Sequence, residues 1–187
     1  MKKFCFVLMV LMLQGCFSST PNSSFYLLES EQSPLPVSNK NISVSVADIF
    51  LPDYLQKPQI VLQKSDSPEL KISEFNRWGS DLEGMIQNII IEDLQNLMPN
   101  AVVKPLTFGT KTQYVVKINI EKMSGYFNQK AVLKGVYQIL STSGKVIKQK
   151  DFKFERMVGK TYADYAKVQS ILLSDLANKL AGDVTKY

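Results

Sequence analysis

The chain has 187 residues, with 22 Lys and Arg against 17 Asp and Glu, two cysteines and no histidine. The commonest general base and metal ligand of proteins is therefore missing. The net charge of +5 is modest and the lysines are dispersed. We interpret them as a solvated face rather than a patch for anionic lipid or a partner, and expect no nucleic-acid binding.

The N-terminus reads as an export signal. Two lysines precede an apolar run that ends in Leu13-Gln14-Gly15-Cys16. About ten apolar residues suit a signal-peptide core, whereas a membrane-spanning helix needs about 20. The ending resembles the bacterial lipobox, in which the cysteine becomes the acylated first residue of the mature protein. We predict a signal peptide over residues 1–15 and acyl chains on Cys16; a secretory signal with an incidental cysteine is the alternative.

Residues 16–24 are mostly small and polar, which predicts a flexible tether. Phe17 follows the acylated cysteine, and lipoproteins without Asp at that place generally go to the outer membrane, so we expect an anchor there, facing the periplasm. Once Cys5 is removed with the signal, the mature chain holds no free thiol for a disulfide, a metal site or a nucleophile. Residues 25–187 suit a single domain.

Several strands are expected before the first helix. The apolar run Phe25–Leu28 suits a short buried strand. The alternation of Ile42, Val44 and Val46 with serines is typical of a half-buried strand. Residues 59–63 and 70–75 are two further short candidates, separated by a turn.

Between these strands, residues 49–61 hold large apolar side chains between two prolines that restrict the backbone. These side chains either close one end of the core or form a contact surface. The only tryptophan lies just before the first helix, where it could hold the helix against this segment. As a candidate partner or self-association surface we name Leu51, Pro52, Tyr54, Leu55, Pro58, Gln59, Ile60 and Trp78.

Two amphipathic helices are expected. The first begins at Ser80, with Glu83 completing a capping box, and is ended by Pro99; the second runs from Thr161, where Asp164 fits a capping arrangement, to Gly182. Between them, residues 114–120, 132–140 and 146–154 predict an antiparallel meander. The order predicts an α+β fold, a mixed or mainly antiparallel sheet with both helices packed on one face.

No catalytic motif stands out in the sequence. No serine lies in Gly-x-Ser-x-Gly and no glycine-rich phosphate loop follows a strand. Glu92 and Asp93 are adjacent, but neighbouring residues on a helix do not face each other. We therefore predict a non-enzyme without a metal or cofactor, apart from the acyl chains on Cys16.

A resemblance to a known family is carried by the aromatic-apolar start, by the motif Leu-Pro-x-Tyr-Leu-x-x-Pro-Gln-Ile-Val and by Arg-Trp ahead of an amphipathic helix. The chain resembles the PqiC family, the auxiliary lipoprotein component of ABC-type, MCE-associated transport systems. The residues that carry the resemblance are Tyr26, Leu51, Pro52, Tyr54, Leu55, Pro58, Gln59, Ile60, Trp78 and Tyr114.

The resemblance implies an outer-membrane docking subunit of an intermembrane lipid transport system. Its partners would be an MCE-domain periplasmic protein and, indirectly, an inner-membrane permease and ATPase, with self-association as a further expectation. Two alternatives remain open. One is a periplasmic carrier that holds an acyl chain between sheet and helices. The other is a structural envelope lipoprotein unconnected with transport.

Overall fold

The computed structural model describes residues 21–30, 35–107 and 109–187. The expected signal peptide and Cys16 lie outside the described residues. The elements are β1 (Ser24–Tyr26), β2 (Ser43–Phe50), the 3-10 turn η1 (Asp53–Leu55), β3 (Gln59–Gln63), β4 (Leu70–Trp78), α2 (Leu82–Leu97), β5 (Val102–Pro105), β6 (Tyr114–Ser124), β7 (Lys130–Ser141), β8 (Val146–Met157) and α3 (Tyr162–Val184).

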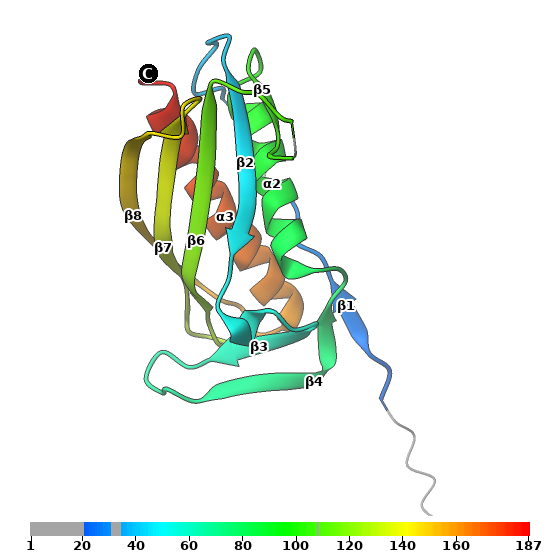
Figure 1. Ribbon diagram of the computed structural model, residues 1–187. Coiled ribbons are helices and arrows are strands. Elements are labelled where there is room, and N and C mark those ends of the chain that lie inside the picture. The colour runs from blue at the N-terminus through cyan, green and yellow to red at the C-terminus, as the bar shows by residue number, and fades with distance from the viewer. Residues whose placement is uncertain (1–20, 31–34, 108) are drawn as a thin grey trace, which may run out of the picture.

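The strands form two sheets. The larger has the order β5-β2-β6-β7-β8, in which β2 is parallel to both neighbours and β6, β7 and β8 form an antiparallel meander. Helices α2 and α3 lie side by side behind this sheet (Figure 1), where α2 packs on β2 and β5 and α3 packs on β7 and β8. The expected α+β fold and meander are confirmed.

Alternating burial along the strands explains the two layers. On β6, Val116, Ile118 and Ile120 are buried, whereas the intervening Lys117 and Asn119 are exposed. Each helix contributes a continuous apolar stripe to the same layer, as the 3.6-residue period requires. The core therefore lies between one face of the large sheet and the two helices.

A register shift in β2 sets where the chain leaves the large sheet. The pairing with β6 shifts between Val46 and Ile49, and Val46 and Ile49 are both buried although they stand three positions apart. A bulge of this kind adds one residue and bends the strand. After it, Phe50 points away from the core and is 63% exposed, and the chain passes toward the smaller sheet.

The smaller sheet has the order β1-β4-β3 and lies across one end of the molecule (Figure 1). The prediction of a buried strand over Phe25–Leu28 was wrong in part. β1 is a three-residue edge strand, parallel to β4, in which Phe25 is 65% exposed, and the following Leu27 is 59% exposed. Only one side of this short strand faces the domain: Tyr26 packs against the core and is half-buried, and Leu28 after the strand is buried in it.

Two helix boundaries differ from those expected. The N-cap of α2 is Asp81 rather than Ser80, because the Asp81 carboxylate accepts a hydrogen bond from the Gly84 N–H at 2.8 Å. The N-cap of α3 is Thr161 and forms the expected capping box with Asp164. Helix α3 continues past Gly182 to Val184, because Val184 is fully buried and holds the last turn against the core.

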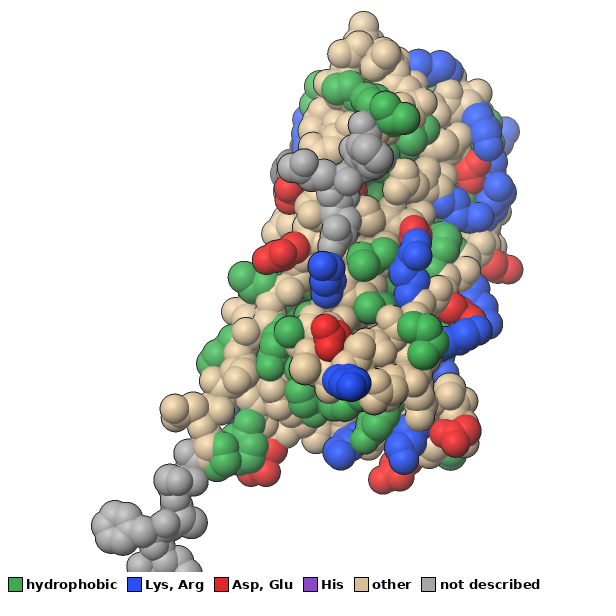
Figure 2. Space-filling view, turned by 180° about the vertical axis from the view of Figure 1, so that it is seen from behind, with side chains coloured by type: hydrophobic (Ala, Val, Ile, Leu, Met, Phe, Trp, Pro, Cys, Tyr) green, Lys and Arg blue, Asp and Glu red, His purple; other side chains and the backbone are tan. Residues whose placement is uncertain are grey.

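The last turn of α3 is tied to the sheet by a charged cluster around Asp183. This carboxylate is nearly buried and accepts hydrogen bonds from the Tyr137 hydroxyl and from Lys148 at 3.0 Å and Lys186 at 2.8 Å; Lys150 lies 3.3 Å away. Burial alone would raise the pKa of Asp183, but these donors together hold the pKa below its usual range. Figure 2 shows the Lys and Arg side chains gathered along this edge of the molecule.

The observed cap of α2 makes a direct prediction. Replacing Asp81 by Ala should lower the free energy of unfolding by about 1 kcal/mol, because the Gly84 N–H loses its acceptor. Ser80→Ala should change that free energy by less than about 0.5 kcal/mol, as expected of a surface site. Urea unfolding followed by circular dichroism measures both; equal losses would contradict the assignment of the cap.

The Asp183 cluster predicts a dependence of stability on pH. A carboxylate whose pKa is lowered by folding stabilises the protein above the unfolded pKa of about 3.9, and this stabilisation is lost as the pH falls below it. Asp183→Asn should therefore cost about 2 kcal/mol at pH 7, and the difference between the variant and the original protein should shrink at pH 3. Urea unfolding at both pH values measures this.

Asp175→Asn is the matched control on the same helix. The half-buried Asp175 pairs with the exposed Arg156 at 2.9 Å at the surface, and surface pairs contribute about 0–1 kcal/mol. If Asp175→Asn lowered the free energy of unfolding at pH 7 as much as Asp183→Asn, the Asp183 cluster would stabilise the protein no more than a surface ion pair does.

Candidate functional site

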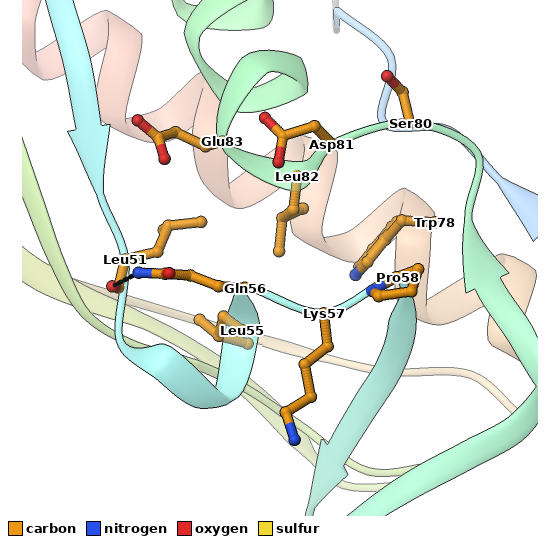
Figure 3. A pocket seen from close by; sticks show the side chains of 10 residues that line it. All are labelled: Leu51, Leu55, Gln56, Lys57, Pro58, Trp78, Ser80, Asp81, Leu82 and Glu83. Atoms are coloured by element: carbon orange, nitrogen blue, oxygen red, sulfur yellow. Dashed lines mark hydrogen bonds between the residues drawn. The ribbon is translucent and has the colours of Figure 1, made fainter.

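A pocket of about 460 Å³ lies at the junction of the two sheets, between the segment that follows β2 and the start of α2 (Figure 3). Its lining combines apolar side chains with polar and charged ones from two separate parts of the chain, residues 51–58 and 78–83. These residues are Leu51, Leu55, Gln56, Lys57, Pro58, Trp78, Ser80, Asp81, Leu82 and Glu83.

The first wall of the pocket is the turn between β2 and β3. Pro52 precedes η1 in an extended conformation, and its carbonyl accepts a hydrogen bond from the Leu55 N–H at 2.9 Å. The Gln56 side-chain amide donates to the Leu51 carbonyl at 2.9 Å, which closes the turn (Figure 3). Leu51 and Leu55 are thereby directed inward and are buried.

Trp78, the last residue of β4, joins this wall to the second one. Its backbone N–H donates to the Pro58 carbonyl at 2.7 Å, so the strand end is fixed to the 51–58 turn. Trp78 is 5% exposed, and the centroid of its ring lies 6.4 Å from that of the Tyr165 ring on α3. The backbone hydrogen bond and the ring contact hold the start of α2, the turn and α3 together.

The start of α2 supplies a negatively charged rim. Asp81 and Glu83 stand on the helix side of the pocket, and Lys57 extends away from them (Figure 3). Burial raises the pKa of Glu83, and the negative charges of Asp81 and Asp48 raise it further. Among the described residues, none of these three carboxylates forms an ion pair.

The residues singled out from the sequence divide into two groups. Leu51, Leu55, Ile60 and Trp78 are buried, which favours the interpretation that they close one end of the core. Pro52, Tyr54 and Gln59 are half-buried and Pro58 is exposed. Leu51, Leu55, Pro58 and Trp78 line the pocket, whereas Pro52, Tyr54, Gln59 and Ile60 do not.

Sequence reasoning included Gln56 and Lys57 only as part of the 49–61 segment, did not assign Asp81 to the site, and treated Ser80 and Glu83 only as capping residues. The available signal was weak: two acidic residues, Asp81 and Glu83, in the five positions that follow the only tryptophan. Their approach to the 51–58 turn depends on how β4 pairs with β3, which local sequence does not reveal.

The pocket offers surfaces for binding. Its side chains supply an apolar floor, hydrogen-bonding groups and negative charge. Among the described residues, no three His, Cys, Asp or Glu side chains are grouped so that they could hold a metal ion. No helix within the described part of the chain has the length and apolar character needed to cross a membrane.

The stability of variants in the 51–58 turn distinguishes whether this turn closes the core or serves only as a contact surface. Leu55→Ala should lower the free energy of unfolding by about 2–4 kcal/mol, because it removes a buried side chain and leaves a cavity. Pro58→Ala, on the exposed side of the same pocket, should cost less than about 1 kcal/mol. Chemical denaturation measures both values; a cost for Leu55→Ala as small as that for Pro58→Ala would mean that the turn does not close the core.

Comparison with known proteins gives a consistent result along the chain. A family model described as "ABC-type transport auxiliary lipoprotein component" matches residues 26–181. The protein named "Intermembrane transport lipoprotein PqiC" from Escherichia coli (strain K12) is 27% identical over 189 residues, covering 100% of this chain and 99% of that protein.

Two solved structures share the fold. The crystal structure of an uncharacterized protein superposes with a TM-score of 0.73 at 24% identity and covers 88% of this chain and 99% of its own. The crystal structure of a protein from Xanthomonas campestris gives a TM-score of 0.71 at 15% identity, over 87% of this chain and 94% of that one.

Proposed function

This chain belongs to the family of ABC-type transport auxiliary lipoprotein components, and we propose that it is a non-catalytic docking subunit of an intermembrane lipid transport system at the outer membrane. The observation that carries the proposal is the match along the whole length of the E. coli intermembrane transport lipoprotein PqiC. The resemblance to the PqiC family seen in the sequence is thereby confirmed.

The proposed anchor is the acylated Cys16, followed by a tether that joins the domain at β1. Acyl chains at about 0.8 kcal/mol per buried methylene give a stable attachment when more than one chain is present. β1 lies at the end of the domain that carries the smaller sheet, and the C-terminus lies at the opposite end (Figure 1). A domain held in this way keeps the 51–58 turn at its membrane-proximal end.

The proposed partners are an MCE-domain periplasmic protein and, through it, an inner-membrane permease and ATPase. The chain lacks histidine and the mature form lacks a free thiol, which supports a role in holding other proteins rather than in catalysis. Pro58 is exposed and Pro52, Tyr54 and Gln59 are half-buried. These residues of the 49–61 segment therefore remain accessible to a partner or to a second copy of the chain.

The carrier alternative lacks a comparable supporting observation. The layer between the large sheet and the helices is filled by apolar side chains such as Ile86, Val116 and Leu172, which are fully buried. An acyl chain would have to displace this packing. We therefore expect native mass spectrometry to find the folded domain without a bound lipid, apart from the acyl chains of its own anchor.

The docking role predicts co-purification. The full chain, tagged after the exposed Tyr187 and isolated from crosslinked, detergent-solubilised envelopes, should recover an MCE-domain protein together with permease or ATPase subunits. The readout is mass spectrometry of the recovered proteins. Recovery of envelope proteins that include no transport subunit would contradict the proposal and favour a structural lipoprotein.

Cys16→Ser is the control that separates the anchor from the partner. In this variant, incorporation of a clickable palmitate analogue should be lost, because the acylated side chain is absent. If the original chain were itself unlabelled and free in osmotic-shock fluid, the anchoring part of the proposal would be wrong.

A further inference from the structure

The pocket at the 51–58 turn holds an unused hydrogen-bond donor. Trp78 is only 5% exposed. The nitrogen of its indole ring lies on the pocket side (Figure 3). Among the described residues, this N–H forms no hydrogen bond, and it is not one of the polar atoms sealed from solvent. An indole N–H that faces a pocket and has no acceptor within the domain is suited to an acceptor on a bound molecule, such as a peptide carbonyl.

The floor next to this donor is apolar. Leu51, Leu55 and Leu82 are each less than 9% exposed and face the same space (Figure 3). The volume of about 460 Å³ is within the usual range of about 300–1,000 Å³ for binding pockets. An apolar side chain that entered here would leave water and contact the floor.

The rim adds negative charge that no ion pair among the described residues neutralises. One carboxylate oxygen of Asp81 accepts the hydrogen bond from the Gly84 N–H. Glu83 and Asp48 lie nearby and add two further carboxylates. Lys57, the basic residue of the pocket lining, extends away from Asp81 and Glu83 (Figure 3). A cation from another molecule would relieve this repulsion, whereas a phosphate placed beside these carboxylates would increase it.

We propose that this pocket binds a peptide segment of a protein subunit of the transport system, in which an apolar side chain adjoins a lysine or arginine. The apolar side chain occupies the floor, the basic side chain pairs with Glu83, and a backbone carbonyl accepts from the Trp78 indole. This inference rests on the proposed docking function and identifies the partner chemistry of its site. The charge of the rim favours such a segment over a phospholipid headgroup.

The test places a photoreactive benzoylphenylalanine at Ser80, an exposed residue of the pocket lining, in the full membrane-anchored chain. The same group at Glu92, exposed on α2 and outside the pocket lining, is the matched control. After irradiation of intact envelopes, the crosslinked peptide is sequenced by mass spectrometry. We expect the Ser80 probe, but not the Glu92 probe, to capture a transport-subunit segment that has an apolar residue next to Lys or Arg.

Charge reversal tests the pairing with Glu83. Glu83→Lys should reduce the Ser80 crosslink at least fivefold, and Glu92→Lys should leave it unchanged. Glu83→Gln, which keeps the size of the side chain, should give an intermediate loss. Circular dichroism establishes that each variant is folded, so a loss of crosslinking reflects the pocket.

Three results would overturn the inference. They are a captured segment without a basic residue, a crosslink to lipid alone, and a crosslink that Glu83→Lys leaves unchanged. If co-purification still recovers transport subunits in any of these cases, the docking function stands and only the partner chemistry assigned to the pocket is wrong. If no transport subunit is recovered, the proposed function fails together with the inference.

Discussion

The five-stranded sheet buries one face only, and this one-sided burial is the constraint on which the other features depend. Val116, Ile118 and Ile120 of β6 are shielded from water by α2 and α3, while the residues between them face solvent. Two amphipathic helices are wide enough to cover five strands, but they leave the lower end of the layer open. The 51–58 turn and the smaller sheet close that end. The inner side of the turn therefore completes the core, while its outer side remains accessible.

Because the turn has a buried side and an accessible side, the pocket is lined by both apolar and charged residues. Leu51 and Leu55 complete the core from within, and the same turn presents Gln56 and Lys57 to water. The helix that begins at Asp81 brings acidic residues to its N-terminal turn, where the helix dipole favours negative charge. The charged rim is therefore compatible with the stability of α2 and does not require a strained backbone. A binding surface of this kind can be maintained at little cost to the fold.

Local sequence patterns predicted the elements that local patterns control. The meander and both helices follow from periodicity over ten or more residues, and Thr161 with Asp164 is a short-range capping signal. The predictions that were wrong concern features that are set by contacts between residues far apart in the sequence. Phe25 is exposed because β1 pairs with β4 some 50 positions later, and α3 passes Gly182 because Val184 is held by the core. The pocket could be suspected from the 49–61 segment, but its acidic wall depended on the pairing of β3 with β4 and could not be predicted.

The place of Trp78 has a spectroscopic consequence. It is the only tryptophan beside eight tyrosines, so long-wavelength ultraviolet excitation selects a single indole in the whole protein. That indole is shielded by Tyr165 on one side and meets the pocket on the other. Its emission maximum and quenching by iodide or acrylamide therefore gauge the hydration of one defined location, without any dye or engineered label.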